Sequence, residues 1–190
     1  MNNRKNSTVK NLACCALLAA ISIVMARPLS IPMPNGVRWS LDKFPLFLAG
    51  MFFGPLMGGL TGFVADLLGS LMQYGFTPAL CPPAILYGVF GGLFSRFLAK
   101  KFSAYRLVIV YLFPVVIGSI LYQSVALSFY YPHGPLKESI IYFLITRTIQ
   151  FTIIMSLEAF ILSVLMKANI FTRIGLWPPV QKGSQSNECQ

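Results

Sequence analysis

The chain has 190 residues, of which 56% are hydrophobic and 11% are charged, and its mean hydropathy is +0.69. A soluble domain carries about 25% charged residues, so this composition excludes an ordinary soluble protein. A transmembrane helix needs about 20 apolar residues, and the chain therefore has room for about six such helices with short loops.

The net charge of +10 comes from fifteen Lys and Arg against five Asp and Glu. These basic residues lie between apolar runs and form no long stripe with interleaved aromatics, which argues against binding of nucleic acid. The four cysteines lack metal-ligand spacing, and His133 is the single histidine. The sequence therefore predicts no metal site and no cofactor in this chain.

Successive apolar runs predict an all-α bundle of six transmembrane helices. The first run has a basic start and ends at Arg27, so it resembles a signal peptide, but the runs after it and the proline at position 28 favour a retained helix. Gly54 and Pro55 predict a tight turn between the second and third runs. The expected spans cover residues 11–27, 41–53, 54–72, 82–99, 106–130 and 139–167, in one membrane domain over 1–172 with a polar tail over 173–190.

The distribution of cations predicts the orientation in the cell membrane. If the N-terminus is cytoplasmic, ten of the fifteen Lys and Arg lie on the inner side, as the positive-inside rule requires. Both termini are then cytoplasmic. The inner ten are Arg4, Lys5, Lys10, Arg96, Lys100, Lys101, Arg106, Lys167, Arg173 and Lys182.

Small residues suggest close helix packing around the expected turn. Glycines recur at every fourth position, and this spacing lets membrane helices approach closely. We expect tight packing of the second and third helices rather than a hinge. The glycines are Gly50, Gly54, Gly58 and Gly62.

The known sequence motifs of several enzymes and ATPases are absent. There is no GxxxxGK[ST] loop for ATP, so uphill transport would take its energy from an ion gradient or a partner. There is no GxSxG elbow, and His133 lies in an expected outer loop rather than in a span. The sequence therefore predicts a protein that is not an enzyme.

Three ionisable residues fall at membrane depth, where a charge is costly and usually faces a cavity or a partner. They are Asp66, Arg147 and Glu158. Glu158 follows Arg147 by eleven residues, which at about 100° per residue returns to nearly the same helix face, with Gln150 between them. Two interpretations stay open: an internal ion pair, such as Asp66 with Arg147, or a ligand site.

Residues near the expected outer ends favour the ligand site. Arg27, Arg38 and Arg147 are suited to converge on a carboxylate, because guanidinium groups bind carboxylates in a bidentate fork. Aromatic residues nearby suit a flat heterocycle by stacking, or form an interfacial belt instead. They include Trp39, Tyr74, Phe76 and Tyr122.

Four segments together resemble a known family. They are MARPLSIP at 25–32, RWSLDKFPLFLAGMFFGP at 38–55, GFVADLLG at 62–69 and GFTPAL at 75–80. In this order they resemble the substrate-binding S components of energy-coupling-factor (ECF) transporters, and most of all the folate-specific S component. The resemblance covers about residues 13–92.

The resemblance implies a six-helix protein that captures a vitamin from outside, in a pocket roofed by the loops after helices one, three and five. Its implied partners are a transmembrane coupling protein and two ATPases, which use the ATP. The resemblance also implies an Ala-x-x-x-Ala contact with the coupling protein, here Ala16 and Ala20, although ordinary packing explains that spacing equally well.

The chemistry of folate agrees with the residues named above. The hypothesis is that the Asp66 carboxylate accepts hydrogen bonds from the N–H groups of the pterin and that Gln150 adds a further hydrogen bond. The carboxylates of folate are then bound by Arg27, Arg38 or Arg147. Two alternatives remain. One is an S component for another vitamin, such as pantothenate, riboflavin or a queuosine precursor, and the other is a solitary ion-coupled transporter with Asp66 or Glu158 as its ion site.

Overall fold

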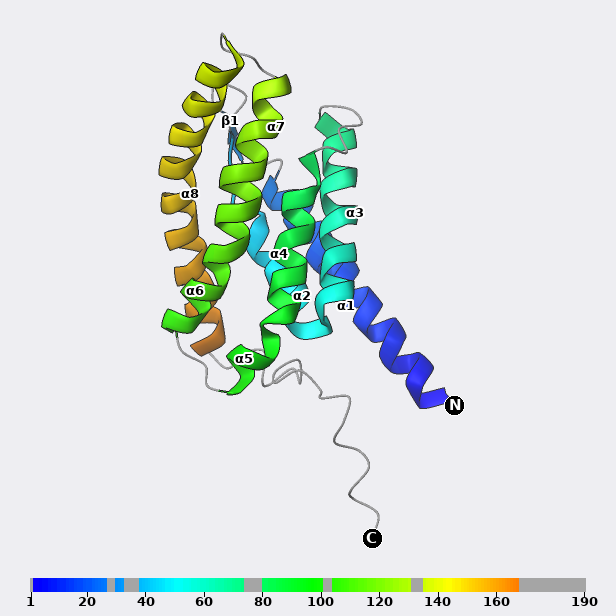
Figure 1. The fold of residues 1–190 in the computed structure, drawn as a ribbon. Helices are drawn as coiled ribbons and strands as arrows, with labels where there is room; N and C mark the ends of the chain where they lie inside the picture. Colours follow the sequence, from blue (N-terminus) through cyan, green and yellow to red (C-terminus); the bar gives the residue numbers. More distant parts are fainter. Residues whose placement is uncertain are drawn as a thin grey trace.

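The computed structural model describes residues 2–26, 30–32, 38–73, 80–100, 104–130 and 135–167. Nearly all of these residues are helical, and the helices run side by side in one bundle (Figure 1). The helices are α1 (Asn2–Ala26), α2 (Lys43–Phe53), α3 (Pro55–Gln73), α4 (Pro82–Leu93), α5 (Ser95–Lys100), α6 (Ala104–Pro114), the π-helix η2 (Val115–Tyr122), α7 (Gln123–Tyr130) and α8 (Leu136–Lys167). The two short strands are β1 (Ile31–Pro32) and β2 (Arg38–Trp39).

The prediction of an all-α bundle with six helical passes is confirmed. Helices α4 and α5 make one pass, broken at Phe94, and α6, η2 and α7 make another. Among the described residues, four passes are long and apolar enough to cross a membrane, namely α1, α3, the α6–α7 pass and α8. The remaining two, α2 and α4, are apolar but have only 11 and 12 residues.

The two ends of the bundle differ. Strands β1 and β2 pair antiparallel, with Ile31 opposite Trp39, shortly after α1 ends and before α2 begins. We call this the hairpin end, and α8 also begins there (Figure 1). The opposite end, where α1 begins and α8 ends, is the terminal end. The predicted tail over 173–190 lies outside the described residues.

Glycines bring α2, α3 and α4 into direct backbone contact. A Cβ added to Gly50 of α2 would overlap the carbonyl oxygen of Gly88 of α4, and one added to Gly58 of α3 would overlap the Cα of Gly50. Gly54 joins α2 to α3 with φ of 93°, a conformation that side chains disfavour. The predicted turn and the predicted tight packing of these helices are both confirmed.

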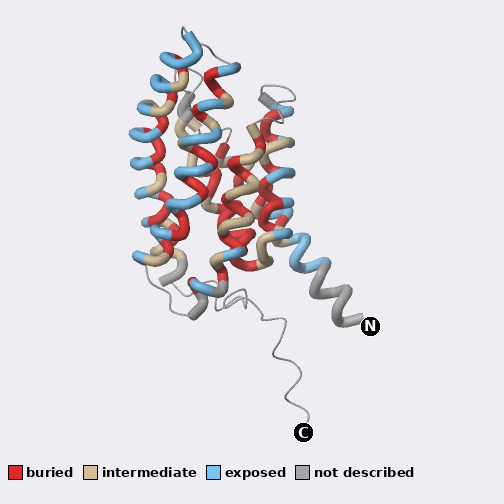
Figure 2. Tube along the Cα trace, in the orientation of Figure 1, coloured by how far each residue is buried: buried red, intermediate tan, exposed pale blue. Residues whose placement is uncertain are grey.

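The outer surface of the bundle is apolar. Large hydrophobic side chains are exposed along every long pass, for example Leu56 at 83% and Phe160 at 67%. The buried residues lie toward the middle of the bundle (Figure 2). A soluble monomer rarely exposes so much contiguous apolar surface, whereas the hydrocarbon of a bilayer accepts it. This pattern is that of a membrane protein.

The α6–α7 pass has irregular geometry in its middle. Pro114 is the last residue of α6, and the π-helix η2 follows it for eight residues. A proline removes one helical hydrogen bond, and π-helical turns widen the backbone, often at functional sites. Within η2, Gly118 packs against Pro83 at the start of α4.

Candidate functional site

The polar stripe predicted on the last helix is buried in the structure. Arg147, Gln150 and Glu158 are 5%, 2% and 1% exposed, and the apolar Ile154 lies between them at 5%. These positions recur at the helical period, so α8 turns one polar face to the interior and its apolar faces outward.

Arg147 is held on this buried face by an aromatic neighbour. Its guanidinium carbon lies 5.6 Å from the centroid of the Phe151 ring, one turn further along α8. Its charge also acts on the hydroxyl group of Tyr87 in α4. A buried guanidinium with a flat ring beside it is suited to an anionic, planar ligand.

Glu158 belongs to a buried network at the start of α2. Its Oε1 accepts a hydrogen bond from the backbone N–H of Lys43 at 3.3 Å, and its Oε2 accepts one from the hydroxyl of Tyr111 in α6. Lys43 in turn pairs with Asp42, at 2.7 Å between Nζ and Oδ2. Asp42 and Lys43 are 4% and 9% exposed.

The same network reaches α1 and the hairpin. The hydroxyl of Ser22 in α1 donates to the carbonyl oxygen of Asp42 at 2.8 Å, and that of Ser40, directly after β2, donates to the Asp42 carboxylate at 2.5 Å. We call Ser22, Ser40, Asp42, Lys43, Tyr111 and Glu158 the buried network. It joins α1, the hairpin, α2, α6 and α8 at one place.

Aromatic residues of α4 and α6 line the side of this network. The Tyr87 and Tyr111 rings lie 5.4 Å apart, and Phe47 of α2 meets Tyr111 edge-on at 5.1 Å. The hydroxyls of Tyr87 and Ser119 hydrogen-bond at 3.0 Å, which ties α4 to the π-helix. Both residues are 0% exposed.

Asp66 of α3 lies beside Cys81, next to the start of α4. It is half-buried on α3, and its carboxylate hydrogen-bonds to the thiol of Cys81, the residue before α4. The charge of Lys43 also acts on this thiol, so the starts of α2 and α4 lie near each other. Two helix N-termini, each with a partial positive charge, therefore lie together in the interior.

The other predicted ligand residues occupy varied positions. Trp39 is half-buried on β2, and Tyr122, at the end of η2, is 40% exposed. Arg38 is placed by its backbone in β2, opposite Pro32. Arg27, Tyr74 and Phe76 lie outside the described residues.

The predicted partner contact lies on the surface of α1. Ala16 and Ala20 are both exposed, whereas Cys15 and Ala19 on the same helix are buried against the bundle. The two alanines therefore point away from the packing interface inside this chain, which leaves them accessible to another helix.

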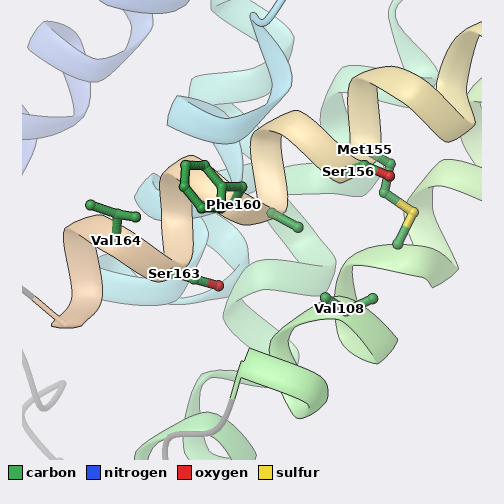
Figure 3. A pocket seen from close by; sticks show the side chains of 7 residues that line it. Val108, Met155, Ser156, Phe160, Ser163 and Val164 are labelled. Carbon is green, nitrogen blue, oxygen red and sulfur yellow. The ribbon is translucent and has the colours of Figure 1, made fainter.

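A separate groove opens between α6 and α8 toward the terminal end (Figure 3). Its volume is about 390 Å³, and it is lined by Val108, Met155, Ser156, Ala159, Phe160, Ser163 and Val164. The lining carries no charge, and the hydroxyl of Ser156 already donates to the Thr152 carbonyl oxygen at 2.8 Å. The groove contains none of the predicted ligand residues.

Residues 6–168 match the family model described as "ECF-type riboflavin transporter, S component". The chain belongs to this family. This confirms the S-component prediction, and because the family consists of transporter subunits, it also confirms that the chain is not an enzyme.

Relatives and a solved structure agree with the family. The folate transporter FolT of Clostridium novyi is 35% identical over 100 residues, covering 50% of this S component and 54% of the relative. Two UPF0397 proteins, from Lactobacillus gasseri and Lactobacillus johnsonii, are 35% identical over 79 residues, covering 40% of this chain and 42% of theirs. The chain thus spans about half the length of the curated relatives it matches, or less.

The fold of this S component is also that of a solved protein. A crystal structure of FolT bound with folic acid aligns with a TM-score of 0.68 at 24% sequence identity, covering 82% of this chain and 92% of that one. At this identity the likeness concerns the fold.

Sequence reasoning missed most of the buried network of this S component. It did not count Lys43 among the inner cations and gave it no role, and it singled out neither Asp42 nor Tyr111. A signal was present for one part, because Asp42 directly precedes an apolar helix, where acidic residues are common. Its link to Glu158 spans 115 residues and left no local pattern.

Proposed function

We propose that this S component captures folate from outside the cell, for ATP-driven uptake by partner subunits. The observation that carries this proposal is the buried cation Arg147, packed on the Phe151 ring inside a membrane bundle. A guanidinium fork binds carboxylates and its flat face packs on rings, and folate brings carboxylates and flat rings together. The folate transporter among the relatives supports the same ligand.

The proposed ligand lies in the hairpin half of the bundle. There the N-termini of α2 and α4 form the floor, and partial positive charges at helix N-termini favour an anion. Arg147, with Arg27 or Arg38, holds carboxylates, Gln150 adds a hydrogen bond, and Asp66 accepts from the pterin. Four aromatic residues are proposed to stack on the rings, namely Trp39, Tyr74, Phe76 and Tyr122.

Riboflavin is the second candidate, because the matching family is described by that vitamin. Riboflavin has flat rings but no carboxylate, so it would use the aromatic residues and would offer no carboxylate to Arg147. The two vitamins therefore make opposite demands on Arg147, and one variant separates them.

The orientation and partners follow from the same proposal. The hairpin end faces outward, and both termini are cytoplasmic, as the positive-inside distribution favours. Ala16 and Ala20 of α1 contact a transmembrane coupling protein, which associates with two ATPases. The exposure of Ala16 and Ala20 supports this contact with the coupling protein, since small residues allow close approach of a second helix. Residues 1–172 act as one membrane domain.

Equilibrium binding to the purified protein in detergent tests the ligand. Trp39 and Trp177 are the two tryptophans of the chain, so a Trp177→Phe background makes Trp39 the reporter of binding. We expect folate to quench Trp39, Arg147→Ala to weaken folate binding about 10- to 100-fold, and Arg147→Lys to restore part of it. Asp66→Asn should weaken folate binding through the pterin.

Riboflavin titrated into the same variants provides the control. Tight riboflavin binding that is insensitive to Arg147→Ala, together with no folate binding, would contradict the proposal and favour the second candidate. Folate binding that is unaffected by Arg147→Ala would remove this arginine from the site.

A further inference from the structure

Helix α2 begins inside the bundle. It has 11 residues and is therefore about 16 Å long, roughly half of the 30 Å hydrocarbon thickness. Glu158, which contacts its first residue, lies nine residues before the end of α8, or about 14 Å from the terminal end. The start of α2 is thus near the middle of the membrane, where the N–H groups of its first turn, which have no acceptor within the helix itself, cannot reach bulk water.

The cap of this helix comes from another helix. Asp42 occupies the N-cap position but makes no capping hydrogen bond with its side chain. Its carboxylate is engaged by Ser40 and by the Lys43 ammonium instead. The Lys43 backbone N–H donates to Glu158 of α8, and Tyr111 holds the second oxygen of that carboxyl group. Glu158, 115 residues further along the chain, therefore accepts a hydrogen bond at the start of α2 that an N-cap side chain would normally accept.

The capped turn is directly connected to the hairpin. Three residues separate the end of β2 from Lys43, and two of them, Ser40 and Asp42, are hydrogen-bonded within the buried network. Ser22 fixes the carbonyl oxygen of Asp42 from the side of α1. Any shift of the start of α2 is therefore passed to Trp39 and the hairpin.

We infer that Glu158 is a positioning residue of the ligand site, which holds the start of α2 and the hairpin in the geometry that retains the ligand. This inference rests on the proposed function for the identity of the ligand. Glu158 acts through Lys43 and the hairpin rather than by touching the ligand. Losing it leaves a helix end unsatisfied inside the membrane and frees the hairpin, so the ligand escapes faster.

Four variants separate positioning from general stability. Glu158→Leu removes both hydrogen bonds, and Glu158→Asp withdraws the carboxyl group by one methylene, beyond reach of Lys43. Glu158→Gln keeps the length and an acceptor for the Lys43 N–H, so it is the rescue variant. Leu162→Ala is the matched control, because Leu162 is fully buried one turn further along α8, outside the buried network.

Amide hydrogen exchange of the ligand-free protein tests the cap directly. We expect exchange in a peptide covering residues 38–46 to rise at least about tenfold in Glu158→Leu and Glu158→Asp, and to stay near wild type in Glu158→Gln. Leu162→Ala should leave this peptide unchanged at a comparable loss of melting temperature. Equal protection of the peptide in wild type and Glu158→Asp would overturn the inference.

The rate of folate release tests the consequence. We expect the dissociation rate to rise about tenfold in Glu158→Asp, with little change in the association rate, and to stay near wild type in Glu158→Gln and Leu162→Ala. If Glu158→Leu does not fold, Glu158→Asp decides. An unchanged dissociation rate in Glu158→Asp would overturn the inference. Absence of folate binding by wild type would contradict the proposed function, and the exchange experiment then decides the inference alone.

Discussion

In the first half of the chain, α2, α3 and α4 touch through their backbones, whereas rings and hydroxyls make several of the contacts that α6 and η2 form with α4. Gly50, Gly58 and Gly88 meet where the first three helices cross. Tyr87 of α4 meets the ring of Tyr111 in α6 and hydrogen-bonds to the hydroxyl of Ser119 in η2.

This difference suggests that α2, α3 and α4 form a rigid scaffold, whereas the later helices form the more adjustable part of the site. Backbone contacts leave one arrangement open to the helices, because no side chain can turn away to relieve a shift. Side-chain contacts and a π-helix allow adjustment, and the buried Arg147 and Gln150 lie in this adaptable half. A rigid glycine-packed unit thus carries one wall of the site, including Asp66, while α8 carries Arg147 and Gln150, which bind the ligand in our proposal.

The largest expected effect breaks the rigid unit. In Gly50→Ala the new Cβ overlaps the backbone of Gly88, so α2 and α4 must separate, at a cost of about 3 kcal/mol or more. We expect loss of the monodisperse folded protein in size-exclusion chromatography. Gly59→Ala is the control, since its Cβ meets only the movable side chains of Val89 and Ile85, the nearer at 2.9 Å. A folded Gly50→Ala variant with wild-type stability would contradict the proposed difference between the two halves.

An intermediate effect is expected at the contact between the halves. Tyr87→Phe removes the hydrogen bond to Ser119 and leaves the buried Ser119 hydroxyl without that partner, which costs about 1 kcal/mol. Unfolding in increasing fractions of SDS, followed by circular dichroism, measures this change. Ser119→Ala should cost a similar amount, and the double variant should cost less than the sum; full additivity would show that the two hydroxyls do not interact.

The smallest effect is expected in the adaptable half. A Cβ added to Gly118 of η2 would lie 3.2 Å from the Cα of Pro83, a contact that a slight shift of the widened helix relieves. We expect Gly118→Ala to change the free energy of unfolding by less than about 1 kcal/mol in either direction. Destabilisation as large as that of Gly50→Ala would show that both halves are equally rigid.

The sequence predicts the regular parts of this fold well, because apolar length and glycine spacing are local signals. The six passes, the turn at Gly54 and the close approach of α2 and α3 were all expected. The role of Gly88 was not, since its partners lie on two other helices. The break at Phe94 and the π-helix after Pro114 also gave no periodic signal within their apolar runs.

The site is predicted less completely for a physical reason. The spacing of Arg147, Gln150 and Glu158 along one helix identifies a polar stripe, and the structure buries all three. Their partners on other helices depend on packing, so no spacing in the chain pairs Glu158 with Lys43. A lysine and an aspartate at the start of a helix read as surface residues until the helix is known to begin inside the membrane.

The short length of α2 has a consequence for biogenesis. An 11-residue apolar segment is too short to enter the bilayer as an independent span, so α2 and α3 are expected to insert together as a helical hairpin turning at Gly54. The carboxyl group that completes the start of α2 is synthesised 115 residues after it. During synthesis, the Lys43 N–H at the start of α2 therefore gains its Glu158 acceptor only after the last helix has been made. A chain truncated before Glu158 lacks this acceptor, and we expect the proteases of membrane quality control to degrade it.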